Sequence, residues 1–70
     1  MANAEIVAIG SELLLGQIVD TNSAWMAQRL TALGVNLYFK SVVGDNPTRM
    51  KEVITRAMER SDIVITSGGL

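Results

Sequence analysis

The sequence predicts an α/β fold, a three-layer half of a doubly wound sheet whose strands are mainly parallel. Short apolar runs typical of buried strands alternate with stretches whose apolar residues share one face of a helix. The order is strand, helix, strand, helix, strand. Crossovers of this length join parallel strands right-handedly, with a helix covering each step. No repeat or low-complexity tract interrupts this order.

The first half of the chain supplies one strand and one helix. Residues 5–9 form an apolar run closed by Gly10, and their composition suits a strand buried on both faces. A cluster of N-cap residues, 20–23, then precedes an apolar face that runs from Met26 to Leu33. Gly34 stands where a glycine ends a helix, so we expect a helix between the cluster and this glycine.

The second half supplies two strands and a second helix. Residues 35–43 alternate between apolar and polar, which predicts a strand with one wetter face at a sheet edge. Asn46 and Pro47 suit the N-cap and first position of a helix whose apolar stripe covers residues 50–57. Residues 63–65 read as a third strand with apolar side chains on both faces. Placing the polar strand at the edge gives the strand order 2-1-3.

A glycine-containing polar cluster follows each of the three predicted strands. The clusters are Gly10-Ser11-Glu12, Gly44-Asp45-Asn46 and Ser67-Gly68-Gly69. Doubly wound sheets bind ligands outside the carboxyl ends of their strands, near the switch point in strand order. Three independent clusters at one edge are stronger support than any single one, so we expect a ligand site there.

The clusters carry residue types that suit a phosphate and a cation. Gly68 and Gly69 lack the Cβ that would keep backbone N–H groups away from an anion, although a plain tight turn is the alternative. Asp45 lies one residue before a helix cap, where a carboxylate can hold a cation or a ribose hydroxyl. Glu12 is either an exposed loop acid or a site residue. We expect the leucines that follow, residues 13–15, to be shielded from water and thereby to hold Glu12 in place.

The cluster at residues 20–23 offers more cap donors than one helix needs. Either Asn22 or Asp20 is therefore free for contact with a ligand, while another residue of the cluster caps the helix.

Composition excludes several classes of function. A net charge of −1 and a pI near 5.1 argue against a nucleic-acid partner. The absence of cysteine and histidine excludes disulfides, thiolate metal sites and imidazole catalysis within this chain. The apolar runs are far shorter than the roughly 20 residues that cross a bilayer, and the N-terminus lacks signal-peptide features. We expect a cytoplasmic protein without a membrane partner.

Three stretches in this order closely resemble the start of the competence/damage-inducible protein CinA family. They are residues 10–22 (GSELLLGQIVDTN), 43–46 (VGDN) and 65–70 (ITSGGL), and the match runs from about Ala4 to Leu70. The CinA N-terminal domain is similar to the molybdopterin-binding domains of MoaB, MogA and MoeA. MoeA-type domains usually carry a longer insertion before the stretch that starts at Gly16, so the spacing favours CinA.

The resemblance implies metal-dependent hydrolysis of the pyrophosphate in ADP-ribose. Residues 1–70 would form the N-terminal portion of a molybdopterin-binding-like domain. The rest of that domain, and a separate C-terminal domain that deamidates nicotinamide mononucleotide, would lie outside the chain. The family's phosphate turn continues past Leu70 with residues that help bind metal and phosphate, so we expect the 70 residues to be inactive alone.

The resemblance also implies roles for particular residues, with Asp45 and Glu12 catalytic. Substrate or phosphate would be bound by Gly10, Ser11, Asn22, Ser67, Gly68 and Gly69. A divalent metal ion is expected in the parent protein, but the sequence of this chain demonstrates none, and the metal ligands are unassigned. The roles of Glu12, Asn22 and Asp45 among ribose, metal and water stay open.

The expected partners are a nucleotide or another phosphate-bearing small molecule, and a second copy of the chain. The second copy would pair through an exposed edge of the sheet, because an edge strand leaves backbone groups without partners. Two other interpretations of the function are kept beside this one. The first is a molybdopterin-binding module of molybdenum cofactor biosynthesis, and the second is a folding and assembly unit without a ligand.

Overall fold

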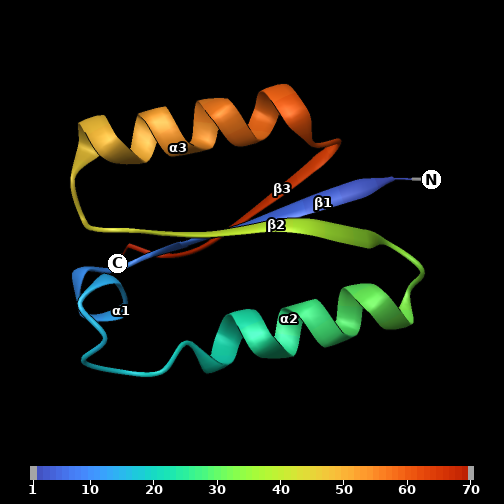
Figure 1. Ribbon diagram of the computed structural model, residues 1–70, viewed down its shortest axis with the longest axis horizontal. Coiled ribbons are helices and arrows are strands. Elements are labelled where there is room, and N and C mark those ends of the chain that lie inside the picture. The colour runs from blue at the N-terminus through green and yellow to red at the C-terminus, as the bar shows by residue number, and fades with distance from the viewer. Residues whose placement is uncertain (1, 70) are drawn as a thin grey trace.

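A computed structural model describes residues 2–69 and shows an α/β architecture (Figure 1). The elements are β1 (Asn3–Ile9), α1 (Ser11–Leu14), α2 (Thr21–Ala32), β2 (Asn36–Val43), α3 (Pro47–Arg60) and β3 (Ile63–Gly68). The strands form one sheet in the order β2-β1-β3, and β1 pairs with both neighbours in parallel. Figure 1 shows α2 on one face of the sheet and α3 on the other. The predicted fold class and strand order are confirmed.

The central strand β1 holds the core together. Its residues Ile6, Val7 and Ala8 are 0% exposed, because a strand with a partner on each side and a helix over each face has no surface left. On the α3 side, Val7 and Ile9 pack with Val43 and Ala57 in one cluster. Four partly buried side chains surround this cluster, namely Met50, Val53, Ile54 and Val64.

Both long helices begin where their sequence signals predict, and α2 also ends there. The Asp20 side chain accepts the Ser23 N–H at 3.0 Å at the start of α2, and Gly34 follows this helix with a φ of +78°. The Asn46 side chain accepts the Arg49 N–H at 3.0 Å, and Pro47 occupies the first position of α3. These caps fix where the preceding loops meet the helices.

The segment between β1 and α2 differs from the expectation. Residues 11–14 form the short helix α1, which no pattern in the sequence predicted. The leucines were expected to be shielded from water, but Leu14 is 52% exposed and Leu15 is 69% exposed. α1 lies beyond the end of β1 rather than over a sheet face, so nothing among residues 2–69 covers its outer side (Figure 1).

The two outer strands are less buried than their apolar residues suggested. Phe39 of β2 is 41% exposed, and Ile63 of β3 is 40% exposed. β3 was expected to carry apolar side chains on both faces. It is an edge strand among the described residues, as the predicted order implies, so its apolar side chains are only partly covered.

A buried carboxylate ties the amino end of β1 to the end of α3. Glu5 is 0% exposed and accepts hydrogen bonds from Arg60 Nη2 at 2.6 Å, Arg60 Nε at 2.9 Å and Ser61 Oγ at 2.9 Å. The Arg60 guanidinium also stacks over the Phe39 ring, 3.7 Å from its centroid. The bidentate bond to Arg60 lowers the pKa of Glu5 below its ordinary value and outweighs burial, which raises the pKa.

Because folding lowers this pKa, the Glu5–Arg60 pair should stabilise the fold at neutral pH and lose its effect on acidification. Its contribution is present above the unfolded pKa near 4.5 and falls as the pH drops through the lower folded value. We expect Glu5→Gln to lower the free energy of unfolding by roughly 2 kcal/mol at pH 7. Urea unfolding at several pH values should then show a weaker acid dependence than the wild type.

The control for this prediction is Glu52→Gln, which removes an exposed carboxylate from α3. It should keep the wild-type pH dependence. Stability profiles of Glu5→Gln and the wild type that run parallel with pH would contradict the prediction.

Candidate functional site at the carboxyl edge of the sheet

The three predicted clusters lie together at the carboxyl ends of the strands, a side of the sheet that we call its carboxyl edge. In the strand register, Ile9 of β1 stands opposite Val43 of β2 and opposite Gly68 of β3, so all three strands end at the same level. Figure 1 shows α1, the connection from β2 to α3 and the end of β3 at this side of the molecule. The edge therefore gathers residues 10–12, 44–46 and 67–69.

The turn at the end of β3 requires glycine. Gly68 and Gly69 have φ angles of +86° and +81°, a region that side chains with a Cβ rarely adopt. A Cβ on Gly68 would lie 2.1 Å from the Ile9 carbonyl oxygen, and a Cβ on Gly69 would lie 3.3 Å from Ile9 Cγ2. The backbone of β3 thus turns against the end of β1 at a distance that no other residue allows. Ser67, half-buried, lies one step earlier, opposite Ala8.

The loops after β1 and β2 are joined to each other. The Ser11 hydroxyl oxygen accepts the Asp45 N–H at 3.2 Å, and the Gly10 N–H donates to the Val43 carbonyl at 2.9 Å. Gly44 lies so close to α1 that a Cβ there would be 3.2 Å from Leu14 Cδ2. These contacts couple the first two clusters directly.

Two carboxylates at this edge are free to meet a ligand. Asp45 and Glu12 are exposed, and neither carboxylate accepts a hydrogen bond or forms a salt bridge within residues 2–69. Glu12 folds back over Gly10, where a Cβ would lie 2.7 Å from Glu12 Oε1. Asn46, by contrast, is occupied in capping α3.

Metal binding at this edge would have to use few protein ligands. Across residues 2–69, no three side chains of His, Cys, Asp and Glu gather into a set that could hold a metal ion. Carboxylate oxygens are nevertheless ligands that Mg²⁺ accepts, and this ion commonly takes one or two carboxylates together with water and substrate phosphates. Asp45 and Glu12 fit that kind of site.

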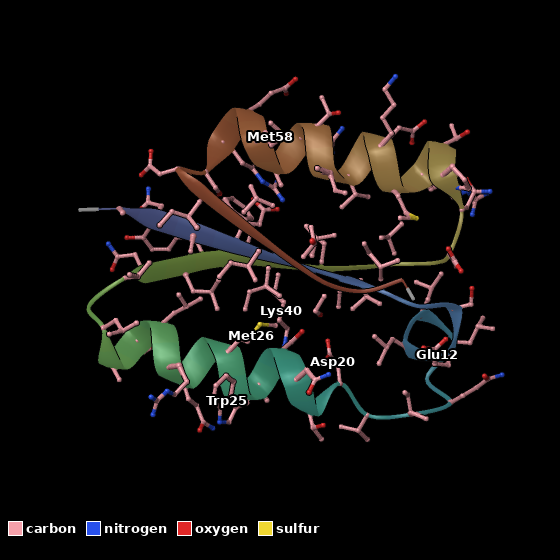
Figure 2. All side chains as sticks on the ribbon, turned by 180° about the vertical axis from the view of Figure 1, so that it is seen from behind. Glu12, Asp20, Trp25, Met26, Lys40 and Met58 are labelled. Atoms are coloured by element: carbon pink, nitrogen blue, oxygen red, sulfur yellow. The ribbon has the colours of Figure 1, made fainter. Side chains whose placement is uncertain are left out.

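The start of α2 carries a pair of polar residues, Asp20 and Ser23, and the sequence pattern pointed only to Asp20 as a candidate. Asp20 is the helix cap, while Asn22 is exposed in the first turn and has no contact that joins it to the three clusters. Ser23 is 0% exposed, and neither its Oγ nor Asp20 Oδ2 has a hydrogen-bond partner within residues 2–69. Figure 2 shows Asp20 and Lys40 in the layer between α2 and the sheet.

These neighbours affect the charge of Asp20. The nearby Ser23 side chain lowers the pKa of Asp20, as do the Ser23 N–H and the positive charge of Lys40, and together they outweigh burial. The carboxylate is thus ionised at neutral pH. Ser23 was not predicted as a site residue, and its only signal was its place three positions after the cap.

Grooves elsewhere on the surface lie away from this edge. One of about 300 Å³ lies between β2 and α3, and its lining residues are Ser41, Glu52, Val53, Arg56 and Arg60. Arg60 is already engaged by Glu5 there.

Within residues 2–69, no helix is both long and apolar enough to pass through a membrane.

Comparisons with known proteins agree with this architecture. Residues 5–70 match the family described as "Probable molybdopterin binding domain". A competence-damage inducible protein of Listeria monocytogenes is 61% identical over the whole chain, and one of Acetivibrio thermocellus is 54% identical over 97% of it. The chain spans 17% and 16% of the length of these two relatives.

A solved structure shares the fold almost completely. The crystal structure of the protein CinA from Thermoplasma acidophilum superposes with a TM-score of 0.94 and 36% sequence identity. The alignment covers 99% of this chain and 41% of that one. The resemblance to CinA that residues 10–22, 43–46 and 65–70 suggested is confirmed.

Proposed function

The chain belongs to the molybdopterin-binding domain family, and we propose that its carboxyl-edge site binds ADP-ribose for metal-dependent hydrolysis of the pyrophosphate bond. The observation that carries this proposal is the meeting of a glycine turn and two free carboxylates at one edge of a parallel sheet. In the reaction, water adds to one phosphorus and the bridging P–O bond breaks, which gives AMP and ribose 5-phosphate. A cytoplasmic location belongs to the proposal, since the chain lacks cysteine.

The backbone at Gly68 and Gly69 supplies the phosphate cradle in this proposal. With no Cβ in the way, its N–H groups can approach phosphate oxygens as neutral donors, and the Ser67 hydroxyl can add a further donor. Gly10 and Ser11 contact the substrate from the neighbouring loop. Asn22 contacts it from the first turn of α2.

The two carboxylates supply the catalytic groups. Asp45 and Glu12 hold a divalent metal ion or orient the attacking water, and both are free of other partners within residues 2–69. When bound, the metal neutralises phosphate charge and polarises the phosphorus centre.

The 70 residues alone are not sufficient in this proposal. No Lys or Arg lies in residues 10–12, 44–46 or 67–69, and residues 2–69 hold no complete set of metal ligands. Neutralising a pyrophosphate needs more positive charge than these loops supply. We therefore propose that activity requires the further chain present in the longer relatives.

The test is an ADP-ribose hydrolysis assay with Mg²⁺. We expect turnover by a protein that carries this chain at the length of its relatives, and none by the 70 residues alone. Asp45→Asn should lower kcat at least about 100-fold, because a carboxylate that holds metal or water acts in the reaction itself.

Asp62→Asn is the matched control. Asp62 Oδ2 accepts the Asn3 N–H at 3.0 Å at the opposite edge of the sheet, so its loss should leave kcat unchanged. Equal activity in the Asp45 and Asp62 variants would overturn the assignment, as would a longer protein that leaves ADP-ribose intact.

A second candidate function is binding of molybdopterin, which the description of the matching family favours. Both ligands carry phosphate, so both can use the glycine turn. A direct competition experiment separates them: displacement of ADP-ribose by molybdopterin at much lower concentration would favour the second function.

We also propose that the chain associates with a second copy through a sheet edge. β3 is an edge strand within residues 2–69, and a groove of about 380 Å³ runs beside it. This groove is lined by Ile54, Met58, Ser61, Asp62, Val64 and Thr66. Unpaired strand edges next to apolar surface favour pairing between chains.

Light scattering of the 70-residue chain should therefore give a mass above that of the monomer. Thr66→Lys, which places a charge on the exposed edge strand, should restore the monomer, whereas Thr31→Lys on α2 should not. A monomeric mass at every concentration would contradict the proposal.

A further inference from the structure

We infer that Ser11 is a positioning residue for Asp45 and acts through the hydrogen bond that joins the loops after β1 and β2. The Ser11 hydroxyl oxygen accepts the Asp45 N–H at 3.2 Å, across 34 positions of sequence. This inference rests on the proposed function, because it names how one of the two catalytic carboxylates is held in place.

The backbone of Asp45 is fixed on both sides. On one side, Gly44 rests against α1, since a Cβ there would lie 3.2 Å from Leu14 Cδ2 and 3.7 Å from Ser11 Oγ. On the other side, the Asn46 N–H donates to the Gly44 carbonyl at 2.8 Å, and Asn46 is itself the cap of α3. The Asp45 N–H points to Ser11, so the peptide has little freedom to rotate.

The Asp45 side chain is in the opposite situation. It is exposed, and its carboxylate has no hydrogen-bond partner within residues 2–69. A held backbone combined with a free carboxylate is the arrangement expected of a side chain that is placed for a ligand, because little further ordering is needed on binding.

The Ser11 hydroxyl can still donate a hydrogen bond. Its oxygen accepts from Asp45, but its O–H donates to no atom of residues 2–69. The bond to Asp45 restricts the directions in which that proton can point. Ser11 thus links the position of the carboxylate to a donor that can reach a phosphate oxygen of the substrate.

The bond joins the exposed first residue of α1 to the exposed loop after β2, so its loss should disturb geometry more than overall stability. Displacement of a catalytic group by about 1 Å can lower a rate by about 100-fold. Removing the hydroxyl should therefore show its effect in the placement of Asp45 and in catalysis.

The test compares Ser11→Ala with Ser11→Thr, which keeps the hydroxyl. Thr31→Ala is the control, because the Thr31 hydroxyl also makes one exposed hydrogen bond, to the Ala27 carbonyl at 3.0 Å, on α2. Amide hydrogen exchange of Asp45, measured by NMR in the full chain, should be about tenfold faster in Ser11→Ala. It should stay within about twofold of the wild type in the other two variants.

The second readout is ADP-ribose turnover by a protein that carries this chain at the length of its relatives. Ser11→Ala should lower kcat about tenfold, and Ser11→Thr should restore it. In the Asp45→Asn background, Ser11→Ala should cause no further loss of kcat, since two residues that act as one unit are not additive. Loss of the proposed contact between the Ser11 hydroxyl and the substrate should appear in KM instead.

Unchanged exchange of the Asp45 amide in Ser11→Ala would overturn the inference whatever the activity. A loss of kcat that persists fully in the Asp45→Asn background would also overturn it, because Ser11 would then act independently of Asp45. A wild-type protein at the length of the relatives that shows no turnover would overturn the proposed function instead, and the exchange measurement tells the two failures apart because it needs no substrate.

Discussion

The contact between the end of β3 and the end of β1 is the constraint on which the candidate site depends. A Cβ on Gly68 would lie 2.1 Å from the Ile9 carbonyl oxygen, and Gly68 has a positive φ. Only glycine satisfies both conditions. The backbone after β3 can therefore turn directly against the central strand, which brings its N–H groups to the edge where the loops after β1 and β2 are already joined through Ser11 and Asp45.

The two ends of β1 are specialised in different ways. At the amino end, the buried Glu5 is fully paired with Arg60 and Ser61, so its charge serves the packing of α3 on the sheet. At the carboxyl end, the carboxylates of Asp45 and Glu12 have no such partners within residues 2–69. A buried charge without partners would cost several kcal/mol, whereas an exposed one costs little and stays available to a ligand.

Much of the fold follows from the sequence because its signals are local. Asn46 with Pro47 marks the start of α3, and Gly34 marks the end of α2. The clustering of glycine and polar residues after each strand also located the edge. The bond from Asp45 to Ser11, the pairing of Glu5 with Arg60 and the burial of Ser23 join residues through tertiary contacts, which no local pattern encodes. α1 was missed because four residues give too short a period to recognise.

The most direct test of the account is the affinity for ADP-ribose of Gly68→Ala compared with Gly16→Ala, measured by calorimetry with far-UV circular dichroism as a check of folding. Gly16 also has a positive φ, of +74°, but nothing lies within 4 Å of a Cβ placed there. We predict that Gly68→Ala weakens binding at least about tenfold, because the turn must move away from Ile9, and that Gly16→Ala leaves binding within about twofold. Wild-type affinity in a folded Gly68→Ala variant would contradict the account.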